Sequence, residues 1–530
     1  MKLKHKFYRT TLALLTLALL GSCIEFNRPL SSNNKLSDLI GIINDYYVDT
    51  VDVEALVEKT IPKVLSELDP HSVYIPAKEA EQADQELRGS FSGVGIQFMI
   101  QSDTIYVSDV ISGGPAEKVG LMPGDRIITI DDSLYVGKSI NNDGAMKRLK
   151  GPKGSEVTLG IKRQGEKELL SFTIVRGNIP VKSVDASYMI DNRWCYIKAN
   201  KFGETTYPEM LVALAQGMQQ DMEGCIIDLR GNTGGYMMAA IQMVNEFLPK
   251  GQMVVYTEGE NMPRYEEYAN GRGTCQKLPL VVLTDETSAS ASEIFAGAIQ
   301  DNDRGTIIGR RTFGKGLVQQ PIEFADGSAI RLTISRYYTP SGRCIQKPYT
   351  KGENEEYELD LLNRYEHGEF FTQDSIKLDE SIAYETKNGR TVYGGGGIMP
   401  DIFIPEDTTG YTSYYANVAK MGLFTRFPFE YCDRNRTTLS SYTTMEQLVQ
   451  YLKAQDLMEE FVQYATDKGI KRRNNLIRTS KTLMEEILYG NIVYNILGME
   501  EYTKYLNLTD PVVLKAVEVL EKGETAPANL

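Results

Sequence analysis

Histidine is nearly absent from this sequence, which contains three histidines in 530 residues. His5 lies close to the N-terminus, His71 lies in an Asp-Pro-His-Ser segment and His367 lies in a polar stretch. Neither of the last two follows a strand of the main α/β region, so we expect no Ser-His-Asp triad. The sequence also lacks an HExxH motif and clustered metal ligands, so we expect no metal and no cofactor.

Cysteine is also scarce, with six residues at wide spacings and no CxxC pair. Such a pattern favours neither a disulfide framework nor a zinc site. We therefore interpret five of the cysteines as mostly buried, small apolar residues: Cys195, Cys225, Cys275, Cys344 and Cys432.

Positive charge is in deficit, since 57 Lys and Arg face 71 Asp and Glu, for a formal net charge of −14. This balance argues against nucleic acid or an anionic membrane surface as the main partner. Long apolar runs are missing as well, so no segment after the N-terminal leader has the pattern of a membrane helix.

The N-terminus has the pattern of an export leader. A basic head of three lysines and Arg9 precedes an apolar stretch from Leu12 to Leu20, which is too short to span a bilayer. The following Leu-Gly-Ser-Cys23 resembles a bacterial lipoprotein signal, in which Cys23 becomes the acylated first residue. The alternative is an ordinary signal peptide with an incidental cysteine. The lipoprotein interpretation predicts a periplasm-facing protein of the bacterial cell envelope, anchored by lipid to the inner or the outer membrane.

The rest of the chain divides into four regions. After the leader (residues 1–22), the first region, residues 23–83, is a tether followed by helical periodicity at 36–47 and 53–68. Residues 84–179 carry short alternating strands with Gly- and Pro-rich turns, residues 180–407 alternate strands with helices, and residues 408–530 are helical. The expected strands of the second region are 96–100, 105–110, 125–130, 156–162 and 169–175, with helices near 116 and at 142–150.

Within residues 84–179, the loop Gly93-Val94-Gly95-Ile96 and two later glycine motifs together resemble a PDZ domain. In that family the loop binds the C-terminal carboxylate of a peptide through backbone N–H groups, and the next strand accepts the peptide by β-augmentation. The alternative for the loop alone is a plain tight turn.

The alternation from residue 194 onward predicts an α/β core with active groups at the ends of strands. The expected strands are 195–199, 225–229, 280–283, 306–308, 317–324, 329–337 and 398–404, and the expected helices are 207–220, 236–247 and 291–300. Residues 349–393 are polar, without a sustained period, and are interpreted as a surface excursion. The helices expected at 445–466, 483–497 and 512–520 carry no chemical motif, so we interpret the C-terminal region as structural.

Ser290 lies where an apolar strand ends and a helix of small residues begins. Such a junction exposes a side chain at the sheet edge and places helix N–H groups beside it, as an oxyanion requires. The competing interpretation is a capping box formed with Glu293. Ser288 and Ser292 leave the register of the nucleophile open.

Lys315 lies between two glycines and follows a phenylalanine. Burial of such a lysine lowers the pKa of its amine, which can then accept the proton of a serine. Gln319 lies four residues later in an expected strand, on the same face at period two. The alternative for Lys315 is a solvated loop residue.

A second strand-to-helix turn, Asp228-Leu-Arg-Gly-Asn-Thr-Gly-Gly235, contains glycines that let a backbone N–H approach a reacting carbonyl. The alternative is a tight turn with no role in catalysis.

These motifs, together with the segments Tyr338–Arg343 and Gly397–Asp401, resemble the C-terminal processing peptidases, also called tail-specific proteases. The resemblance covers roughly residues 36–407. It implies a crotonase-like α/β core with an inserted PDZ domain, an N-terminal helical segment and a C-terminal helical domain. It further implies Ser290 as nucleophile, Lys315 as general base and Gln319 as the group that positions the lysine, with an oxyanion hole formed by Ala291 N–H and by Gly234 or Gly235.

The sequence thus predicts a serine endopeptidase that recognises C-terminal segments of proteins or peptides, with an adaptor protein as a possible further partner. The alternative from another class is a catalytically silent PDZ scaffold that recruits envelope proteins.

Overall fold

The computed structural model describes residues 34–80, 85, 88–101 and 103–525. The expected leader and lipidation site at Cys23 lie outside the described residues. The chain divides into two units, residues 1–65 and 66–530, and each is described by itself. In the described part of the chain, no helix combines the length and the apolar sequence that a bilayer span requires.

The first unit contributes two helices, α2 (Lys35–Tyr46) and α3 (Val53–Ser66). Both were predicted from apolar residues at helical spacing, and both predictions are confirmed to within two residues at each end. Helix α2 contains no buried residue, so its apolar side chains are not part of a core within this unit.

Residues 84–179, the PDZ-like module, form a five-strand path in the order β3-β4-β5-β7-β8, with β6 paired to β5. The strands and helices are β3 (Ile96–Gln101), β4 (Thr104–Val110), α5 (Pro115–Lys118), β5 (Arg126–Ile130), β6 (Ser133–Leu134), α6 (Asn142–Leu149), β7 (Glu156–Lys162) and β8 (Leu170–Val175). The predicted strands of this region are confirmed within one residue, because alternation places every second apolar side chain in one buried cluster.

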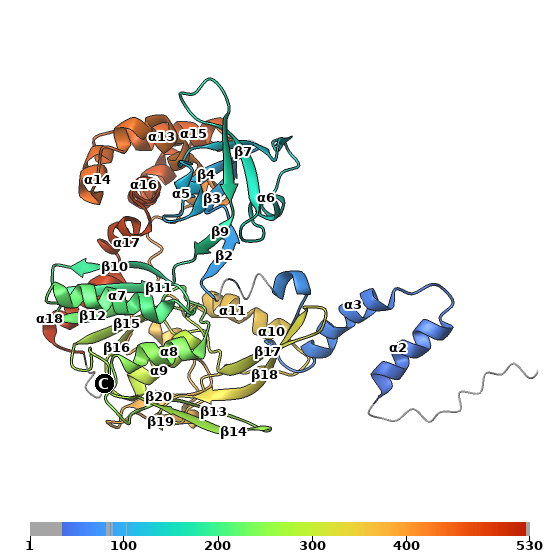
Figure 1. The fold of residues 1–530 in the computed structure, drawn as a ribbon. Helices are drawn as coiled ribbons and strands as arrows, with labels where there is room; N and C mark the ends of the chain where they lie inside the picture. Colours follow the sequence, from blue (N-terminus) through green and yellow to red (C-terminus); the bar gives the residue numbers. More distant parts are fainter. Residues whose placement is uncertain (1–33, 81–84, 86–87, 102, 526–530) are drawn as a thin grey trace, which may run out of the picture. The chain divides into compact units, whose positions relative to one another are not determined.

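A two-stranded ribbon, which the sequence did not reveal, leads into and out of the module. Strand β2 (Ser90–Gly93) pairs antiparallel with β9 (Gly177–Pro180), and the two are visible side by side in Figure 1. The module is therefore an insertion that the chain enters and leaves at the same place.

The α/β core is built on a six-stranded sheet in the order β10-β11-β12-β15-β16-β21. Its strands are β10 (Val184–Ile190), β11 (Trp194–Ala199), β12 (Gly224–Asp228), β15 (Leu280–Thr284), β16 (Thr306–Gly309) and β21 (Ile402–Phe403). All neighbouring pairs from β11 to β21 are parallel, which confirms the predicted α/β class. Strand β21 is much shorter than the predicted 398–404.

Helices cover both faces of this sheet (Figure 1). One face packs against α7 (Thr206–Gln219), α8 (Met237–Asn245) and α9 (Ala291–Asp301), and every residue of α9 is buried. The other face packs against α18 (Pro511–Lys522) through a separate apolar cluster. Because side chains alternate along a strand, Cys195 and Ile197 join the first cluster while Trp194 and Tyr196 join the second.

A second sheet carries the loop of the candidate base. It has the order β1-β18-β13-β14, and β17 pairs with β18 over residues 329–336. The strands are β1 (Val73–Ile75), β13 (Met253–Gly259), β14 (Met262–Tyr268), β17 (Leu317–Glu323) and β18 (Ala329–Tyr338). The β17–β18 hairpin was predicted, whereas β1, β13 and β14 were not.

The interpretation of residues 349–393 as a surface excursion holds for most of these residues, which are exposed or half-buried, but the stretch has secondary structure and a few buried side chains. This stretch forms α10 (Glu355–Glu358), α11 (Asp360–Glu366), η1 (Gln373–Ser375), η2 (Glu380–Ile382), β19 (Ala383–Glu385) and β20 (Thr391–Tyr393). Tyr357 and Arg364 are buried, and Arg364 donates to the carbonyls of Arg311 (2.8 Å) and Thr312 (3.1 Å). Arg364 of this segment thus satisfies two backbone carbonyls of the core.

The C-terminal helical region (408–530) has seven helices among its described residues: α12 (Ser413–Lys420), α13 (Leu423–Leu439), α14 (Met445–Lys453), α15 (Leu457–Asp467), α16 (Asn474–Leu497), α17 (Met499–Asn507) and α18. The helix predicted at 445–466 is two helices, α14 and α15. Helices α12 to α16 share an apolar cluster of their own, whereas α17 and α18 contact the sheet of the core.

The free cysteines agree with the prediction from sequence. Within the described residues none forms a disulfide; Cys195, Cys225, Cys275 and Cys432 are buried, and Cys344 is half-buried.

Candidate active site

Ser290 is the residue between the end of β15 and the start of α9, and its backbone is in an unusual conformation. Its φ of 55° and ψ of −113° lie outside the regions that a serine ordinarily adopts. A residue held in such a conformation stores strain, which is typical of functional turns. The hydroxyls of Ser288 and Ser292 both donate to backbone carbonyls and both residues are fully buried, whereas Ser290 is only partly buried. Of the three serines, Ser290 is therefore the one whose geometry favours a candidate nucleophile.

Glu293 joins the candidate nucleophile to the candidate base. One of its carboxylate oxygens accepts the N–H of Ser290 and the N–H of Lys315, each at 2.8 Å. The other accepts the Thr312 hydroxyl at 2.6 Å and the Gly314 N–H at 2.7 Å. The capping-box prediction for Glu293 is thus consistent with the nucleophile prediction, since the same side chain caps Ser290 and fixes the loop of Lys315.

Tyr337 on β18 makes a second link between the same two residues. Its hydroxyl lies 3.0 Å from the carbonyl oxygen of Ser290 and 2.6 Å from that of Lys315. Because a single carboxylate oxygen holds both amides and a single hydroxyl contacts both carbonyls, the two backbones lie next to each other although 25 positions separate them in the sequence.

The environment of Lys315 favours a neutral amine. Burial, followed by the positive charge of Arg331, lowers the pKa of Lys315 to about 8, against the opposing negative charges of Glu293 and Asp69. Among the described residues no carboxylate forms an ion pair with its Nζ. Lys315 is therefore not the solvated loop residue that the sequence left open.

Gln319 lies on β17, but the reason given for its orientation was wrong. Strand β17 begins at Leu317, so Lys315 precedes it, and the register against β18 shifts between Val318 and Gln319. Simple alternation therefore does not relate the two side chains. The Nε2 of Gln319 is buried without a hydrogen-bond partner in the described part of the structure. A buried amide donor without a partner is costly, so this group is free to bond a neighbouring atom of the site.

The Asp228–Gly235 turn packs directly against Ser290. A Cβ on Gly234 would lie 2.8 Å from Ser290 Cβ and 3.0 Å from Ala291 N, and Gly234 has a φ of +103°. Glycine is required here because any side chain would collide with the head of α9. Asn232, which the sequence did not single out, fixes this contact: its carbonyl accepts the Ala289 N–H (3.0 Å) and the Ser292 hydroxyl (2.8 Å).

The two candidate oxyanion glycines differ in their environments. The N–H of Gly234 donates to the side-chain oxygen of Asn232 at 2.9 Å. Gly235 is exposed, and its N–H, like that of Ala291, has no partner among the described residues. These two N–H groups are the ones available to a ligand.

His71 lies close to Lys315, contrary to the expectation from sequence. Strand β1 pairs with β18, and this pairing places the Asp69–Ser72 segment beside Thr333, which is opposite Gln319. Asp69 accepts the Thr333 hydroxyl at 2.9 Å. Burial, followed by the charge of Lys315, lowers the pKa of His71 to about 4, and His71 Nε2 lies 2.7 Å from the Tyr357 hydroxyl. The long-range pairing of a three-residue strand left no mark in the local sequence. His367 is exposed, with Nδ1 2.6 Å from the Asn363 carbonyl.

The glycine loop of the PDZ-like module is a tightly packed turn. Val94 is buried and its carbonyl accepts the Ala116 N–H at 2.8 Å, while the Gly95 carbonyl accepts the Ile111 N–H at 3.0 Å. Gly95 has a φ of +86°, and a Cβ there would lie 3.0 Å from Ile179. The following strand, β3 (Ile96–Gln101), is the end strand of its sheet, so one of its edges carries no partner within that sheet.

No group of three or more potential metal ligands occurs within the described residues. Three parts of the chain match protein families. Residues 193–353 match Peptidase family S41, residues 82–162 match the PDZ domain, and residues 414–498 match a family of unknown function, DUF8443.

Curated relatives extend these matches over most of the chain. The carboxy-terminal processing protease CtpB of Bacillus subtilis (strain 168) is 34% identical over 358 residues, which cover 67% of this chain and 72% of that protein. The carboxy-terminal-processing protease of Bartonella bacilliformis is 36% identical over 317 residues, covering 59% and 72%.

Among solved structures, a PDZ domain of a carboxy-terminal protease from Vibrio cholerae, in complex with peptide, is 31% identical and covers 17% of this chain and 99% of that one, with a TM-score of 0.16. The span and identity of the curated relatives, together with the two domain matches, show that this chain belongs to the carboxy-terminal processing proteases, serine-type peptidases of family S41 that carry a PDZ domain.

Proposed function

We propose that this protease cleaves its substrates with Ser290 as nucleophile and Lys315 as general base. The observation that carries the proposal is the double link through Glu293 and Tyr337, which holds the backbones of both residues side by side. Two further features support it: Ser290 is strained and only partly buried at a helix N-terminus, and the amine of Lys315 has a lowered pKa.

In the first step the neutral amine of Lys315 accepts the proton of the Ser290 hydroxyl while the serine oxygen attacks the scissile carbonyl. The resulting oxyanion accepts hydrogen bonds from Ala291 N–H and Gly235 N–H, the two donors without partners. The protonated Lys315 then gives its proton to the leaving amine, and the C–N bond breaks to leave an acyl-enzyme. Water, deprotonated by Lys315, hydrolyses the ester and restores Ser290. Gln319 would position the lysine through its buried amide.

Substrate selection is assigned to the PDZ domain. The N–H groups of the Gly93–Ile96 loop would bind the free C-terminal carboxylate, and the open edge of β3 would accept the preceding residues as an added strand. The peptide segment further from the C-terminus would then be the part that reaches Ser290. An adaptor protein is a further partner that this arrangement allows.

The cellular location follows from the leader alone. The basic head, the short apolar stretch and the Leu-Gly-Ser-Cys23 segment support a lipoprotein of the bacterial envelope, held by an acyl chain at Cys23 and facing the periplasm. Metabolic labelling with an alkyne fatty acid would test this, and a Cys23→Ser protein that still incorporates the label would contradict it.

The catalytic assignment is tested with an unfolded reporter such as casein, alone and with candidate adaptors. Ser290→Ala and Lys315→Ala should each abolish cleavage, while the exposed-site controls Ser133→Ala and Lys250→Ala should cleave as the unaltered protein does. Circular dichroism checks that all four variants are folded. Near-normal turnover in the Ser290→Ala or the Lys315→Ala protein would overturn the assignment.

A further inference from the structure

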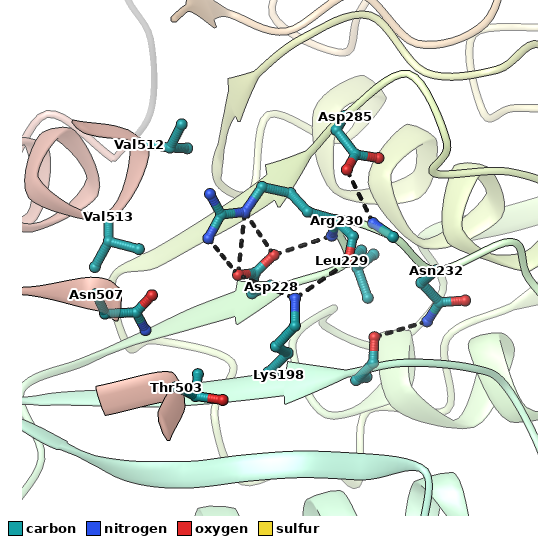
Figure 2. Close-up of polar contacts among 12 residues, drawn as sticks. Lys198, Asp228, Leu229, Arg230, Asn232, Asp285, Thr503, Asn507, Val512 and Val513 are labelled. Carbon is teal, nitrogen blue, oxygen red and sulfur yellow. Dashed lines mark hydrogen bonds and ion pairs between the residues drawn. The ribbon is translucent and has the colours of Figure 1, made fainter. Parts of the chain in front are cut away.

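The turn that carries the oxyanion glycine is held by a buried ion pair. Asp228, at the end of β12, is fully buried. Its carboxylate accepts hydrogen bonds from the guanidinium of Arg230 (2.6 Å) and from the hydroxyl of Tyr196 (2.6 Å). Burial disfavours the ionised carboxylate, but the positive charges of Arg230 and Lys198 outweigh it and hold the pKa of Asp228 below its usual range. Figure 2 shows Lys198 and Arg230 converging on this carboxylate.

Arg230 has a second acidic partner, which comes from the C-terminal helical region. Its guanidinium donates to Asp510 at 2.7 Å, and the Arg230 side chain is 18% exposed. Asp510 is also the N-cap of α18, since its other oxygen accepts the N–H groups of Val512 (2.8 Å) and Val513 (3.3 Å). The two valines, which are labelled in Figure 2, are buried against the core sheet. The position of Asp510 is therefore fixed by the packing of its own helix.

The segment after Arg230 reaches the oxyanion position within five residues. Gly231 N–H donates to Asp285 at 3.0 Å, and the Arg230 carbonyl accepts Lys198 Nζ at 3.2 Å. The turn then passes through Asn232 to Gly235. The backbone and the side chain of Arg230 are thus both held in place. Its carbonyl accepts a hydrogen bond from Lys198 of the core, and its guanidinium pairs with Asp228 of the core and Asp510 of the C-terminal region.

We propose that Asp510 is a positioning residue for the peptidase reaction: through Arg230, the C-terminal helical region sets the place of the Gly235 N–H and thereby completes the oxyanion hole. This inference rests on the proposed function, because it needs Gly235 as the oxyanion donor. It gives a role in the reaction to a region that carries no chemical motif and that we interpreted from the sequence as structural.

The test separates the charge of Asp510 from its role as a helix cap. Asp510→Asn keeps a good N-cap acceptor but loses the charge that pairs with Arg230, whereas Asp510→Glu keeps the charge. Glu518→Gln is the matched control, since it also converts an acid to its amide on α18, at an exposed pair with Lys515 and Lys522. All are made in the mature chain and assayed with a fluorogenic peptide that has a free C-terminus.

Removal of one oxyanion hydrogen-bond donor lowers kcat by a factor of about 10²–10³. A donor that remains but is displaced should therefore lower kcat by a factor of about ten. We expect kcat to fall about tenfold in Asp510→Asn with KM nearly unchanged, to recover at least partly in Asp510→Glu, and to stay unchanged in Glu518→Gln. The melting temperature of Asp510→Asn should match that of Glu518→Gln.

Three results would overturn the inference: a kcat of Asp510→Asn equal to that of Glu518→Gln, an equal loss in Asp510→Glu and Asp510→Asn, or a loss of kcat accompanied by a lowered melting temperature. Ser290→Ala is assayed in parallel. If it retains turnover, the proposed function fails; if it is inactive while Asp510→Asn is normal, only the positioning role fails.

Discussion

The protonation of Lys315 should govern how the rate of cleavage depends on pH. Its pKa of about 8 means that about a tenth of the enzyme carries a neutral amine at pH 7 and about nine tenths at pH 9. Since kcat/KM reports the ionisation of the free enzyme, it should rise about eight- to tenfold between these two pH values. The assay is hydrolysis of a fluorogenic peptide with a free C-terminus, followed from pH 5 to pH 10 at constant ionic strength.

Two variants that each remove one charge should shift the rising part of this pH–rate profile in opposite directions. Arg331 lowers the pKa of Lys315 and Asp69 raises it. We therefore expect Arg331→Gln to move the rising part to higher pH and Asp69→Asn to move it to lower pH. General damage to the site would reduce the maximal rate in both variants but would not shift their profiles in opposite senses.

The same profile tests the nearby histidine as an alternative base. The pKa of His71 is about 4, so a histidine-dependent reaction would already be at its plateau at pH 6. A flat profile between pH 6 and pH 9, or shifts of the same sign in the two variants, would refute the assignment of Lys315 as the base.

Other predictions concern stability, alignment and specificity. Lys315→Met should abolish cleavage yet stabilise the fold at pH 7 by up to about 3 kcal/mol, because the pKa of Lys315 in the folded state lies about 2.5 units below that of the unfolded chain. This gain in stability should disappear as the pH rises from 8 to 10.5. Denaturation at several pH values measures it, and a gain that does not depend on pH would contradict the prediction. The amide of a Glu293→Gln variant cannot accept all four hydrogen bonds that the Glu293 carboxylate accepts. We therefore expect kcat to fall at least about 100-fold and the free energy of unfolding to fall by about 1–3 kcal/mol. A normal kcat in steady-state assays would contradict the role of Glu293 in holding Ser290 and Lys315 together. A substrate whose C-terminus is an amide should be cleaved more slowly than the same substrate with a free acid. Gly95→Ala, which strains a residue with a φ of +86°, should weaken this preference for the acid. Equal rates for the acid and the amide would contradict a role of the PDZ domain in substrate selection.

Much of the fold could be predicted because its elements are locally encoded. Strands β3, β4, β7 and β8 of the PDZ domain and the helices α7 and α9 were placed to within one or two residues by the period of their apolar side chains. Among the strands that escaped prediction, β1, β2 and β9 have four residues or fewer and pair with a distant strand, whereas β13 and β14 have seven residues each and pair with each other.

The candidate site, too, could be predicted from the sequence only in part. Ser290, Lys315 and the Gly234–Gly235 pair could be named from motifs, because strand-to-helix junctions and glycine turns are visible in the sequence. Their relative placement was not visible, since it depends on Glu293 and Tyr337, whose partners lie on different elements.

By itself, the sequence determined the type of most parts: helices, a PDZ domain, an α/β core with serine, lysine and glycine at its turns, and a helical end. Tertiary structure alone decided that His71 lies near Lys315, that residues 349–393 are partly core, and that Asp510 contacts the Asp228–Gly235 turn through Arg230. The physical reason is the range of the interactions involved. Hydrophobic periodicity and turn chemistry act within a few residues, whereas ion pairs and strand pairing join residues that only the folded chain brings together.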